Sequence, residues 1–367
     1  MNMAPLVSPR RKTRQIRVGQ VMVGSDALIS VQSMTNTQTS DIQATIQQIQ
    51  ALTAAGCEII RVAVPEMADA KAIRQIKDQI TIPLIADIHF DFRLALAAAE
   101  SGADGLRINP GNIGARHKVK HVVDCAKSHG IPIRIGVNAG SLEKQIEQRL
   151  GTTSAAMAES GLANIRILED LGFEDIKVSL KASDVTRTVE AYQLLAKKTD
   201  VPFHVGVTEA GGLYAGITKS AIGIGLLLSR GLGDTIRVSL TRDPVEEIRT
   251  GYEILRALDI RRKGPEIISC PTCGRCRINL FKIAEDVEKA LLERDTQIKV
   301  AIMGCVVNGP GEAKEADIGI AGGDGTGILF KKGTVFKKVP QDRLVEQLLD
   351  EIDKMTQNSE DVNGSKK

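Results

Sequence analysis

Three cysteines lie close together in the segment SCPTCGRC, residues 269–276. They are Cys270, Cys273 and Cys276, and a fourth thiol, Cys305, follows in MGCVVNGPGE. Thiolates at this spacing bind soft metal centres, and four sulfurs would suit either zinc or an iron–sulfur cluster. The chain has only six cysteines in 367 residues, too few for a disulfide framework, so we interpret this cluster as a metal centre.

Basic residues recur at regular places within short apolar segments. Arg61, Arg107 and Lys177 each follow a glycine by five positions, and three further basic residues lie in equivalent segments: Arg134, Lys181 and Arg237. Forked guanidinium groups bind phosphate oxygens well, so a group of such residues predicts a phosphate-rich ligand. Any one of these residues could instead cap a helix or pair with an acid, and Asp87 and Glu209 could supply such partners.

Side chains two positions apart on a strand share one face. Asp87 and His89 form such a pair, and so do Arg134 and Asn138, so each pair can point at one ligand. A lone histidine is more often a core residue than a catalytic one, but His89 has Asp87 as its neighbour.

The segments that carry these residues are eight apolar runs separated by stretches with helical periodicity. The runs are 27–34, 58–65, 83–90, 105–110, 131–138, 175–182, 202–209 and 235–240. Strand and helix repeated eight times predict an α/β fold of the TIM-type (β/α)8 barrel class, with the site at the carboxyl ends of the strands. Residues 17–24 alternate with a period of two, and we expect them to form a hairpin that plugs the barrel bottom.

A second domain is predicted after a charged Gly-Pro segment near Gly264. We expect a barrel domain at 1–264, a small α+β domain at 265–358 and a disordered tail at 359–367. Within the second domain the pattern predicts helices at 278–294 and 342–355 and strands at 298–309, 317–323 and 327–339.

Composition excludes several classes of function. The net charge is +3, with seven Phe, three Tyr and no Trp, which does not favour a nucleic-acid-binding surface. No apolar run approaches the roughly 18 residues of a membrane span, and the basic N-terminus lacks the apolar region of a secretory signal. We therefore expect a cytoplasmic protein that binds neither membrane nor nucleic acid.

Nine motifs together resemble one enzyme family. They are SMTNT, RVAVP, ADIHF, RINPGNIG, RIGVNAGSLE, VSLKASD, GVTEAGG, SCPTCGR and IMGCVVNGPGEAKEADIGIAGG. They resemble the bacterial 4-hydroxy-3-methylbut-2-enyl diphosphate synthases of the non-mevalonate isoprenoid pathway, over residues 10 to 355. The resemblance implies a TIM barrel, a small cluster-bearing domain, and a homodimer in which each barrel faces the partner's cluster domain.

The resemblance also implies a four-iron, four-sulfur (4Fe-4S) cluster held by Cys270, Cys273, Cys305 and Glu312. Spacing alone would choose Cys276 as the fourth ligand, but the family pattern has no cysteine there. An oxygen ligand holds iron less firmly than thiolate does, so a carboxylate could yield its place to substrate.

The implied reaction is reductive ring opening of 2-C-methyl-D-erythritol 2,4-cyclodiphosphate to the linear allylic diphosphate and water. Its two electrons arrive singly from reduced flavodoxin or ferredoxin. By resemblance, basic residues bind the diphosphate, while Asp87 and His89 position the substrate together with one amide. A second amide can orient the substrate or a cluster ligand, and Glu209 is a candidate acid for the departing hydroxyl. The basic residues are Arg61, Arg107, Arg134 and Lys181, and the amides are Asn138 and Asn308.

Two other hypotheses remain open on the sequence. A pterin-binding-type barrel synthase, with a structural zinc or without metal, would also use VQSMTNT and a cationic barrel mouth. A non-catalytic electron carrier would use the thiols but would not need the barrel. Anaerobically purified protein should be brown if it holds an iron–sulfur cluster and colourless if it holds zinc.

Overall fold

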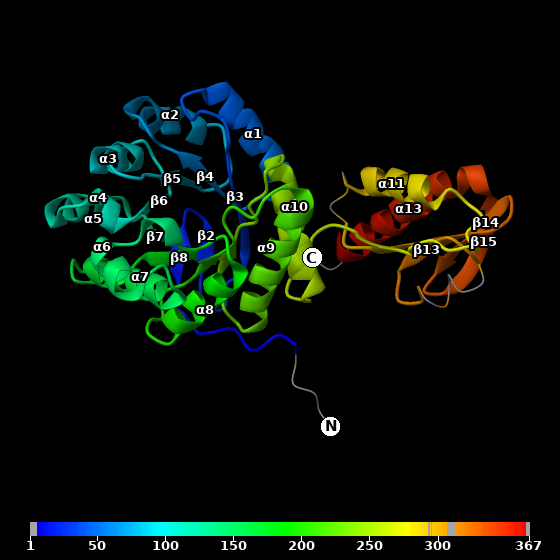
Figure 1. Ribbon diagram of the computed structural model, residues 1–367. Helices are drawn as coiled ribbons and strands as arrows, with labels where there is room; N and C mark the ends of the chain where they lie inside the picture. Colours follow the sequence, from blue (N-terminus) through cyan, green and yellow to red (C-terminus); the bar gives the residue numbers. More distant parts are fainter. Residues whose placement is uncertain (1–5, 293, 295, 307–310, 312, 365–367) are drawn as a thin grey trace. The chain divides into compact units, whose positions relative to one another are not determined.

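The computed structural model describes residues 6–292, 294, 296–306, 311 and 313–364. It divides into two compact units, Met1–Arg261 and Arg262–Lys367, which are described separately (Figure 1). None of the described helices is both long and apolar enough to cross a membrane.

The first unit is a parallel eight-stranded barrel, as predicted. Its strands neighbour one another in the order β8-β7-β6-β5-β4-β3-β10-β9, and a parallel bridge between Val178 and Phe203 links the two ends. All eight predicted runs contain one of these strands, which are shorter than the runs themselves. The strands are β3 Ser30–Met34, β4 Ile59–Ala63, β5 Leu84–Asp87, β6 Gly105–Ile108, β7 Ile133–Asn138, β8 Ile176–Lys181, β9 His204–Val205 and β10 Thr235–Ile236.

Helices surround the barrel strands (Figure 1). Several begin where an aspartate side chain accepts a hydrogen bond from a backbone N–H of the first turn, as Asp41, Asp91, Asp184 and Asp243 do. Gly130 ends one helix in the left-handed conformation that glycine tolerates best. The helices are α1 Ile42–Ala54, α2 Met67–Lys77, α3 Phe92–Glu100, α4 Pro110–Ile113, α5 Arg116–His129, α6 Lys144–Leu150, α7 Ser154–Glu169, α8 Val185–Ala196, α9 Leu213–Ser229 and α10 Pro244–Ala257, with a 3-10 turn η1 at Ala139–Ser141.

The apolar core of this unit lies between the strands and the helices. Ile60 and Val62 of β4 belong to it, whereas Arg61 between them takes the opposite direction, into the barrel. A separate apolar cluster is formed where the hairpin of β1 (Ile16–Val18) and β2 (Val21–Val23) packs against Ile59 and Ile85. The predicted hairpin plug at the amino ends of the strands is thereby confirmed.

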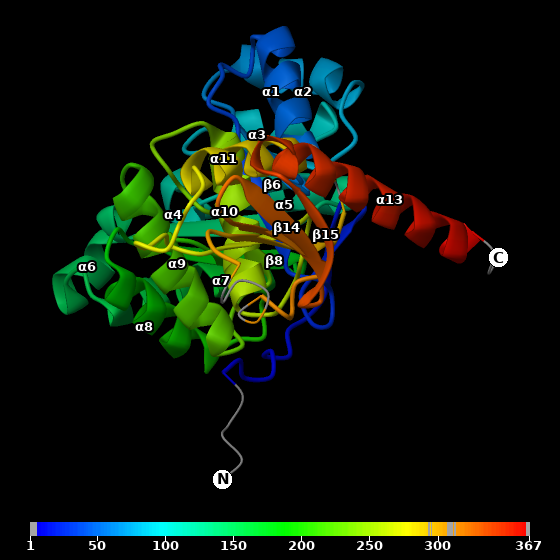
Figure 2. The same ribbon diagram turned by 90° about the vertical axis from the view of Figure 1, so that its right-hand side faces the viewer.

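The second unit is a five-stranded mixed sheet with the order β11-β12-β13-β14-β15. Helices α11 and α13 pack together against one face of the sheet, and a segment with Ala313 and Ala316 packs against the other (Figures 1 and 2). The elements are β11 Glu266–Ser269, α11 Leu280–Leu291, β12 Lys299–Met303, β13 Ile318–Gly322, β14 Thr326–Lys331, β15 Thr334–Pro340, η2 Gln341–Arg343 and α13 Leu344–Gly364.

Two details of the second unit differ from the sequence prediction. Strand β11 pairs in parallel with β12, although its segment was interpreted as part of a charged linker. Helix α13 continues to Gly364, into the predicted tail at 359–367, where the sequence pattern predicted a helix only over 342–355. In β11, polar composition hid a strand that pairing with β12 stabilises.

Candidate functional site

The interior of the barrel is polar, whereas TIM barrels are usually filled by branched apolar side chains. Arg107, Arg134 and Lys177 are adjacent in register on β6, β7 and β8, and all three are buried. The same interior contains further buried polar residues: Ser30, Gln32, Arg61, Asp87, Lys181, His204 and Thr235. A cluster of buried cations of this size requires anionic partners.

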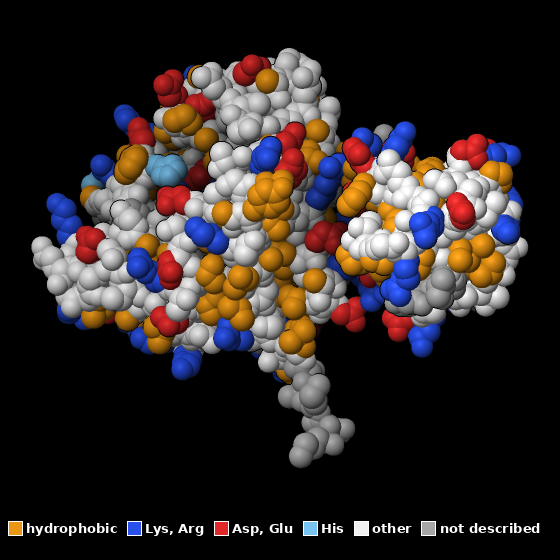
Figure 3. Space-filling model, turned by 45° about the vertical axis from the view of Figure 1, so that its right-hand side comes forward, with side chains coloured by type: hydrophobic (Ala, Val, Ile, Leu, Met, Phe, Trp, Pro, Cys, Tyr) orange, Lys and Arg blue, Asp and Glu red, His pale blue; other side chains and the backbone are white. Residues whose placement is uncertain are grey.

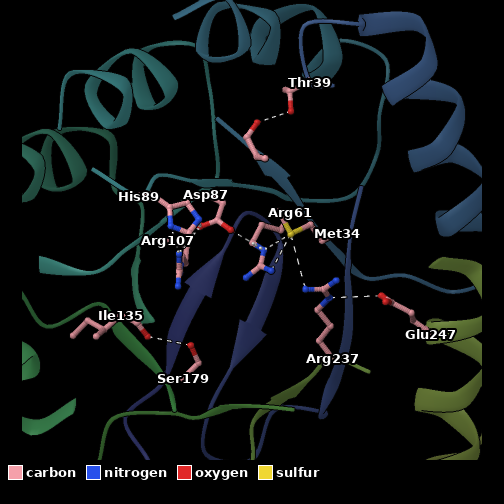
Figure 4. Close-up of polar contacts among 11 residues, drawn as sticks. Met34, Thr39, Arg61, Asp87, His89, Arg107, Ile135, Ser179, Arg237 and Glu247 are labelled. Atoms are coloured by element: carbon pink, nitrogen blue, oxygen red, sulfur yellow. Dashed lines mark hydrogen bonds and ion pairs between the residues drawn. The ribbon is translucent and has the colours of Figure 1, made fainter. Parts of the chain in front are cut away.

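One carboxylate, Asp87 at the carboxyl end of β5, contacts two of the buried arginines (Figure 4). Its Oδ1 atom accepts a hydrogen bond from Arg107 Nη1 at 3.0 Å, and its Oδ2 atom lies 3.4 Å from Arg61 Nε. Burial alone would raise the pKa of the Asp87 carboxyl, but Arg61, Arg107 and Arg134 together lower that pKa to about 2. Asp87 is therefore ionised and holds two guanidinium groups in place.

Three other cations in the barrel, Arg134, Lys177 and Lys181, form no ion pair with a carboxylate among the described residues. Arg134 is 2% exposed, and its Nε and Nη1 atoms have no hydrogen-bond partner among the described residues. Burial, reinforced by neighbouring arginines, lowers the pKa of Arg134 well below its usual value. Burial and nearby arginines also lower the pKa of Lys181 well below its usual value, and that of Lys177 to about 7. A bound anion would therefore stabilise the charged forms of these side chains.

A methionine and a second acid complete the network, and the prediction missed both. The sulfur of Met34 accepts hydrogen bonds from Arg61, and it lies 3.9 Å from Arg237 Nη1. Arg237 Nε lies 3.6 Å from a carboxylate oxygen of Glu247 on α10 (Figure 4). The sequence offered one signal for Met34: it lies in the first apolar run, next in order to the run that contains Arg61.

The remaining predicted barrel residues lie around this network. His89 follows β5 with about half of its side chain exposed, and its ring nitrogens lie 3.3 and 3.5 Å from Arg107 Nη1. Asn138 is level with Lys181 on neighbouring strands. Glu209 lies in the exposed loop between β9 and α9, with the positive φ of 52° that non-glycine residues rarely adopt. The structure thus brings Asp87, His89 and the arginines together, whereas Glu209 lies on a loop beyond its strand.

The thiols lie in loops that follow two adjacent parallel strands, β11 and β12. The Cys270 Sγ atom accepts a hydrogen bond from the backbone N–H of Gly304 at 3.1 Å. A Cβ atom built on Gly304 would lie 2.9 Å from Cys276 Sγ and 3.3 Å from Cys270 Sγ, so both thiols flank the residue before Cys305. Cys273 is exposed. Hydrogen bonds from Arg275 lower the pKa of the Cys273 thiol, and the bond from the Arg275 backbone has the largest effect.

This donor set fits a soft metal centre by its chemistry, because two thiols of the loop after β11 lie beside Gly304, one residue before Cys305 in the loop after β12. Within the described part of the chain, no three Cys, His, Asp or Glu side chains are already arranged around one metal position. The predicted residues Glu312 and Asn308 lie outside the described residues.

Comparisons with known proteins agree with this two-part organisation. A family model described as the GcpE TIM-barrel domain matches residues 13–252, and one described as the GcpE protein C-terminal domain matches residues 266–354. A relative from Geobacter sulfurreducens named 4-hydroxy-3-methylbut-2-en-1-yl diphosphate synthase (flavodoxin) is 60% identical over 94% of this chain and 98% of its own length. A relative of the same name from Caldanaerobacter subterraneus is 57% identical over 95% of this chain and 99% of its own.

Among solved structures, a dihydropteroate synthase from Stenotrophomonas maltophilia covers 69% of this chain and 98% of its own, with a TM-score of 0.49 and 13% identity. The family models, by contrast, match both units along most of the chain. The chain therefore belongs to the GcpE family, with its TIM-barrel domain followed by its C-terminal domain.

Proposed function

We propose that this chain is a 4-hydroxy-3-methylbut-2-en-1-yl diphosphate synthase. It opens the ring of 2-C-methyl-D-erythritol 2,4-cyclodiphosphate, takes up two electrons and two protons, and releases the linear allylic diphosphate and water. The names of relatives at 57–60% identity support the reaction. They do not favour the alternative of a pterin-binding barrel synthase.

The observation that carries the proposal is the set of buried basic side chains inside the barrel. Arg134 and Lys181 are more than nine-tenths buried, and burial lowers the pKa of each well below its usual value. A bound diphosphate would supply negative charge that stabilises the charged forms of both side chains in the barrel interior. Asp87 keeps Arg61 and Arg107 in place, so their remaining N–H donors are oriented before the ligand arrives.

We assign the rim residues roles in binding and proton transfer. Asn138 orients the substrate, and His89 lies beside Arg107, where it can contact the part of the substrate nearest the opening. Asn308, outside the described residues, is assigned an orienting role from the sequence motif alone. Glu209 donates a proton to the departing hydroxyl from its exposed loop. Binding inside the barrel shields the reacting carbon from water during these steps.

The C-terminal unit would hold a four-iron, four-sulfur cluster through Cys270, Cys273, Cys305 and Glu312. When bound, such a cluster supplies single-electron transfer. Support comes from the Cys270 thiol, which accepts a hydrogen bond from the backbone N–H of Gly304, one residue before Cys305. Cys276 is a spare thiol in this assignment.

The partners are a single-electron carrier and a second copy of the chain. The name of the relatives supports flavodoxin as the donor, with ferredoxin as the second candidate. Hydrophobic side chains are exposed on α9, among them Tyr214, Ile222 and Leu226, and Figure 3 shows apolar side chains gathered on the surface of the barrel unit. This face supports a homodimer, which sedimentation velocity should detect and which a monomeric sedimentation coefficient would contradict. Six free thiols support a reducing cytoplasmic location.

Anaerobic turnover tests the function directly. Full-length protein reconstituted with iron and sulfide should convert the cyclic diphosphate to the linear diphosphate when reduced flavodoxin is supplied. Arg134→Met should abolish detectable substrate binding. Arg93→Met, which changes an exposed arginine that forms an ion pair with Asp91, should not. Protein that holds only zinc, or that fails to consume the cyclic diphosphate, would contradict the proposal.

A further inference from the structure

The sulfur of Met34 occupies an unusual position between two guanidinium groups. Met34 ends β3 and is level with Arg61 on β4. Arg61 Nε and Nη2 donate to Met34 Sδ at 3.1 and 2.9 Å, and Arg237 Nη1 approaches the same sulfur at 3.9 Å (Figure 4). One thioether therefore contacts both arginines.

Each guanidinium also has a carboxylate. Asp87 lies 3.4 Å from Arg61, and Glu247 lies 3.6 Å from Arg237. Glu247 is itself fixed, because it accepts hydrogen bonds from the Ser33 hydroxyl and the Leu240 backbone N–H. The two cations are thus held by separate acids, with Met34 between them.

A thioether suits this place because it is a weak, uncharged acceptor. Two guanidinium groups repel each other, and a neutral sulfur between them satisfies donors without cancelling their charge. Burial, opposed by Asp87 and reinforced by Arg237 and Arg107, lowers the pKa of Arg61 to about 10, so Arg61 remains charged at neutral pH. A carboxylate in place of Met34 would compete with a phosphate for the same donors.

We propose that Met34 is a positioning residue, which holds the guanidinium groups of Arg61 and Arg237 so that their free donors meet the phosphate groups of the substrate. This inference deepens the proposed function and depends on it for the identity of the substrate. Its physical content, the binding of a diphosphate by the two arginines, does not depend on electron transfer.

Met34→Leu tests the role of the sulfur, because leucine has a similar volume and no acceptor. We expect KM for the cyclic diphosphate to rise about tenfold, with kcat changed less than about twofold, since the lost contact precedes the chemical step. Met34→Glu should raise KM further, because its carboxylate would occupy the arginine donors. Met157→Leu makes the same exchange at a buried position on α7 and should leave both constants unchanged.

Calorimetric binding of inorganic pyrophosphate to the full chain separates this inference from the proposed function. We expect Met34→Leu to weaken pyrophosphate binding severalfold with an unchanged Tm, and Met34→Glu to abolish it. If Met34→Leu and Met34→Glu both bind pyrophosphate as tightly as the unaltered chain, the inference is wrong, whatever the turnover. If the unaltered chain binds pyrophosphate, the variants weaken it, and no turnover occurs, the positioning role stands and the proposed reaction fails.

Discussion

The two candidate sites of this chain are built in different ways. In the barrel, adjacent strands hold Arg107, Arg134 and Lys177 in register, and Asp87 ties the charges together inside a buried interior. In the C-terminal unit the thiols lie on loops, and Cys273 is exposed. The barrel site is preorganised by its own backbone, whereas the thiol site needs an additional group to draw its ligands together.

This difference has an energetic meaning. A buried ionic network contributes to or subtracts from the stability of its own domain, because its desolvation has already occurred. The thiols of this site are partly or fully exposed, so they have little desolvation cost, and the free energy of gathering them is recovered only when a metal binds. Changes that break a buried ion pair of the barrel should therefore alter stability and ligand binding together, whereas changes at the thiols should alter metal content and turnover without altering the stability of the metal-free chain.

The largest expected effect comes from the thiols. Cys305→Ser should remove nearly all bound iron and all turnover, while the Tm of the chain without metal stays the same. Iron and sulfide analysis with thermal unfolding would measure both. Cys276→Ser is the matched control, and iron content should be retained; loss of iron in this variant would make Cys276 a ligand and break the assignment to Glu312.

The next effect is expected at the barrel network. Asp87→Asn leaves Arg61 and Arg107 buried without their carboxylate, so we expect a loss of about 3–5 kcal/mol in unfolding free energy and loss of pyrophosphate binding. Denaturant titration would measure the first and calorimetry the second. Asp91→Asn alters an exposed helix-capping acid and should change stability by less than about 1 kcal/mol. Equal losses in the two variants would contradict the network role.

The same network gives Asp87 a pH signature. Its folded-state pKa of about 2 lies below the ordinary value of 3.8, so the stabilisation from this group is fully present above pH 3.8. It should disappear as the pH falls through the folded pKa. The free energy of unfolding, measured between about pH 5 and about pH 2, should fall more steeply with decreasing pH for the unaltered chain than for Asp87→Asn.

A smaller effect on stability but a clear one on binding is expected at Gly136. A Cβ atom there would lie 2.6 Å from Arg107 Nη2, so Gly136→Ala should displace that guanidinium and leave the backbone in place. We expect KM to rise about tenfold with little change in Tm. Gly225→Ala on α9, where a Cβ meets nothing within 4 Å, is the control. An unchanged KM would show that Arg107 does not need its present position.

The last expected effect concerns Lys177, and its sign is opposite to that of Asp87→Asn. Burial is the main cause that lowers the pKa of Lys177 from 10.5 to about 7, so between these values the unfolded chain binds a proton that the folded chain does not. Stability should therefore rise as pH increases from 7, and Lys177→Met should flatten this dependence and stabilise the chain at pH 7 by on the order of 1–3 kcal/mol. The exposed Lys120→Met should leave the slope unchanged. A destabilised Lys177→Met would show that the amine has an unseen favourable partner.

The barrel could be predicted from sequence because two independent signals agreed. Eight apolar runs marked the strands, and charged residues within those runs, such as Arg61 and Asp87, predicted a ligand site at the carboxyl ends of the strands. Contacts made across the fold were not predictable in this way. In the sequence, Met34 looks like an apolar core residue and Glu247 like a solvent-exposed helix residue. Only the three-dimensional arrangement brings both of them to Arg237.

The second unit was harder to predict for a related reason. Strand β11 carries Glu266 and follows a charged segment, so its composition did not reveal that it pairs with β12. The thiol spacing identified a metal centre, but spacing could not choose between Cys276 and Glu312. The structure places Cys276 beside Gly304, and Glu312 lies outside the described residues, so this choice is left to the iron analysis of Cys276→Ser.

The hairpin of β1 and β2 has a consequence for how molecules enter and leave. Ile16, Val18 and Val23 are almost completely buried against the first residues of the strands, so that end of the barrel offers no passage. Anything held by Arg134 must arrive and depart through the same opening. Product that lingers there blocks the next molecule, so inhibition by product should be competitive with substrate.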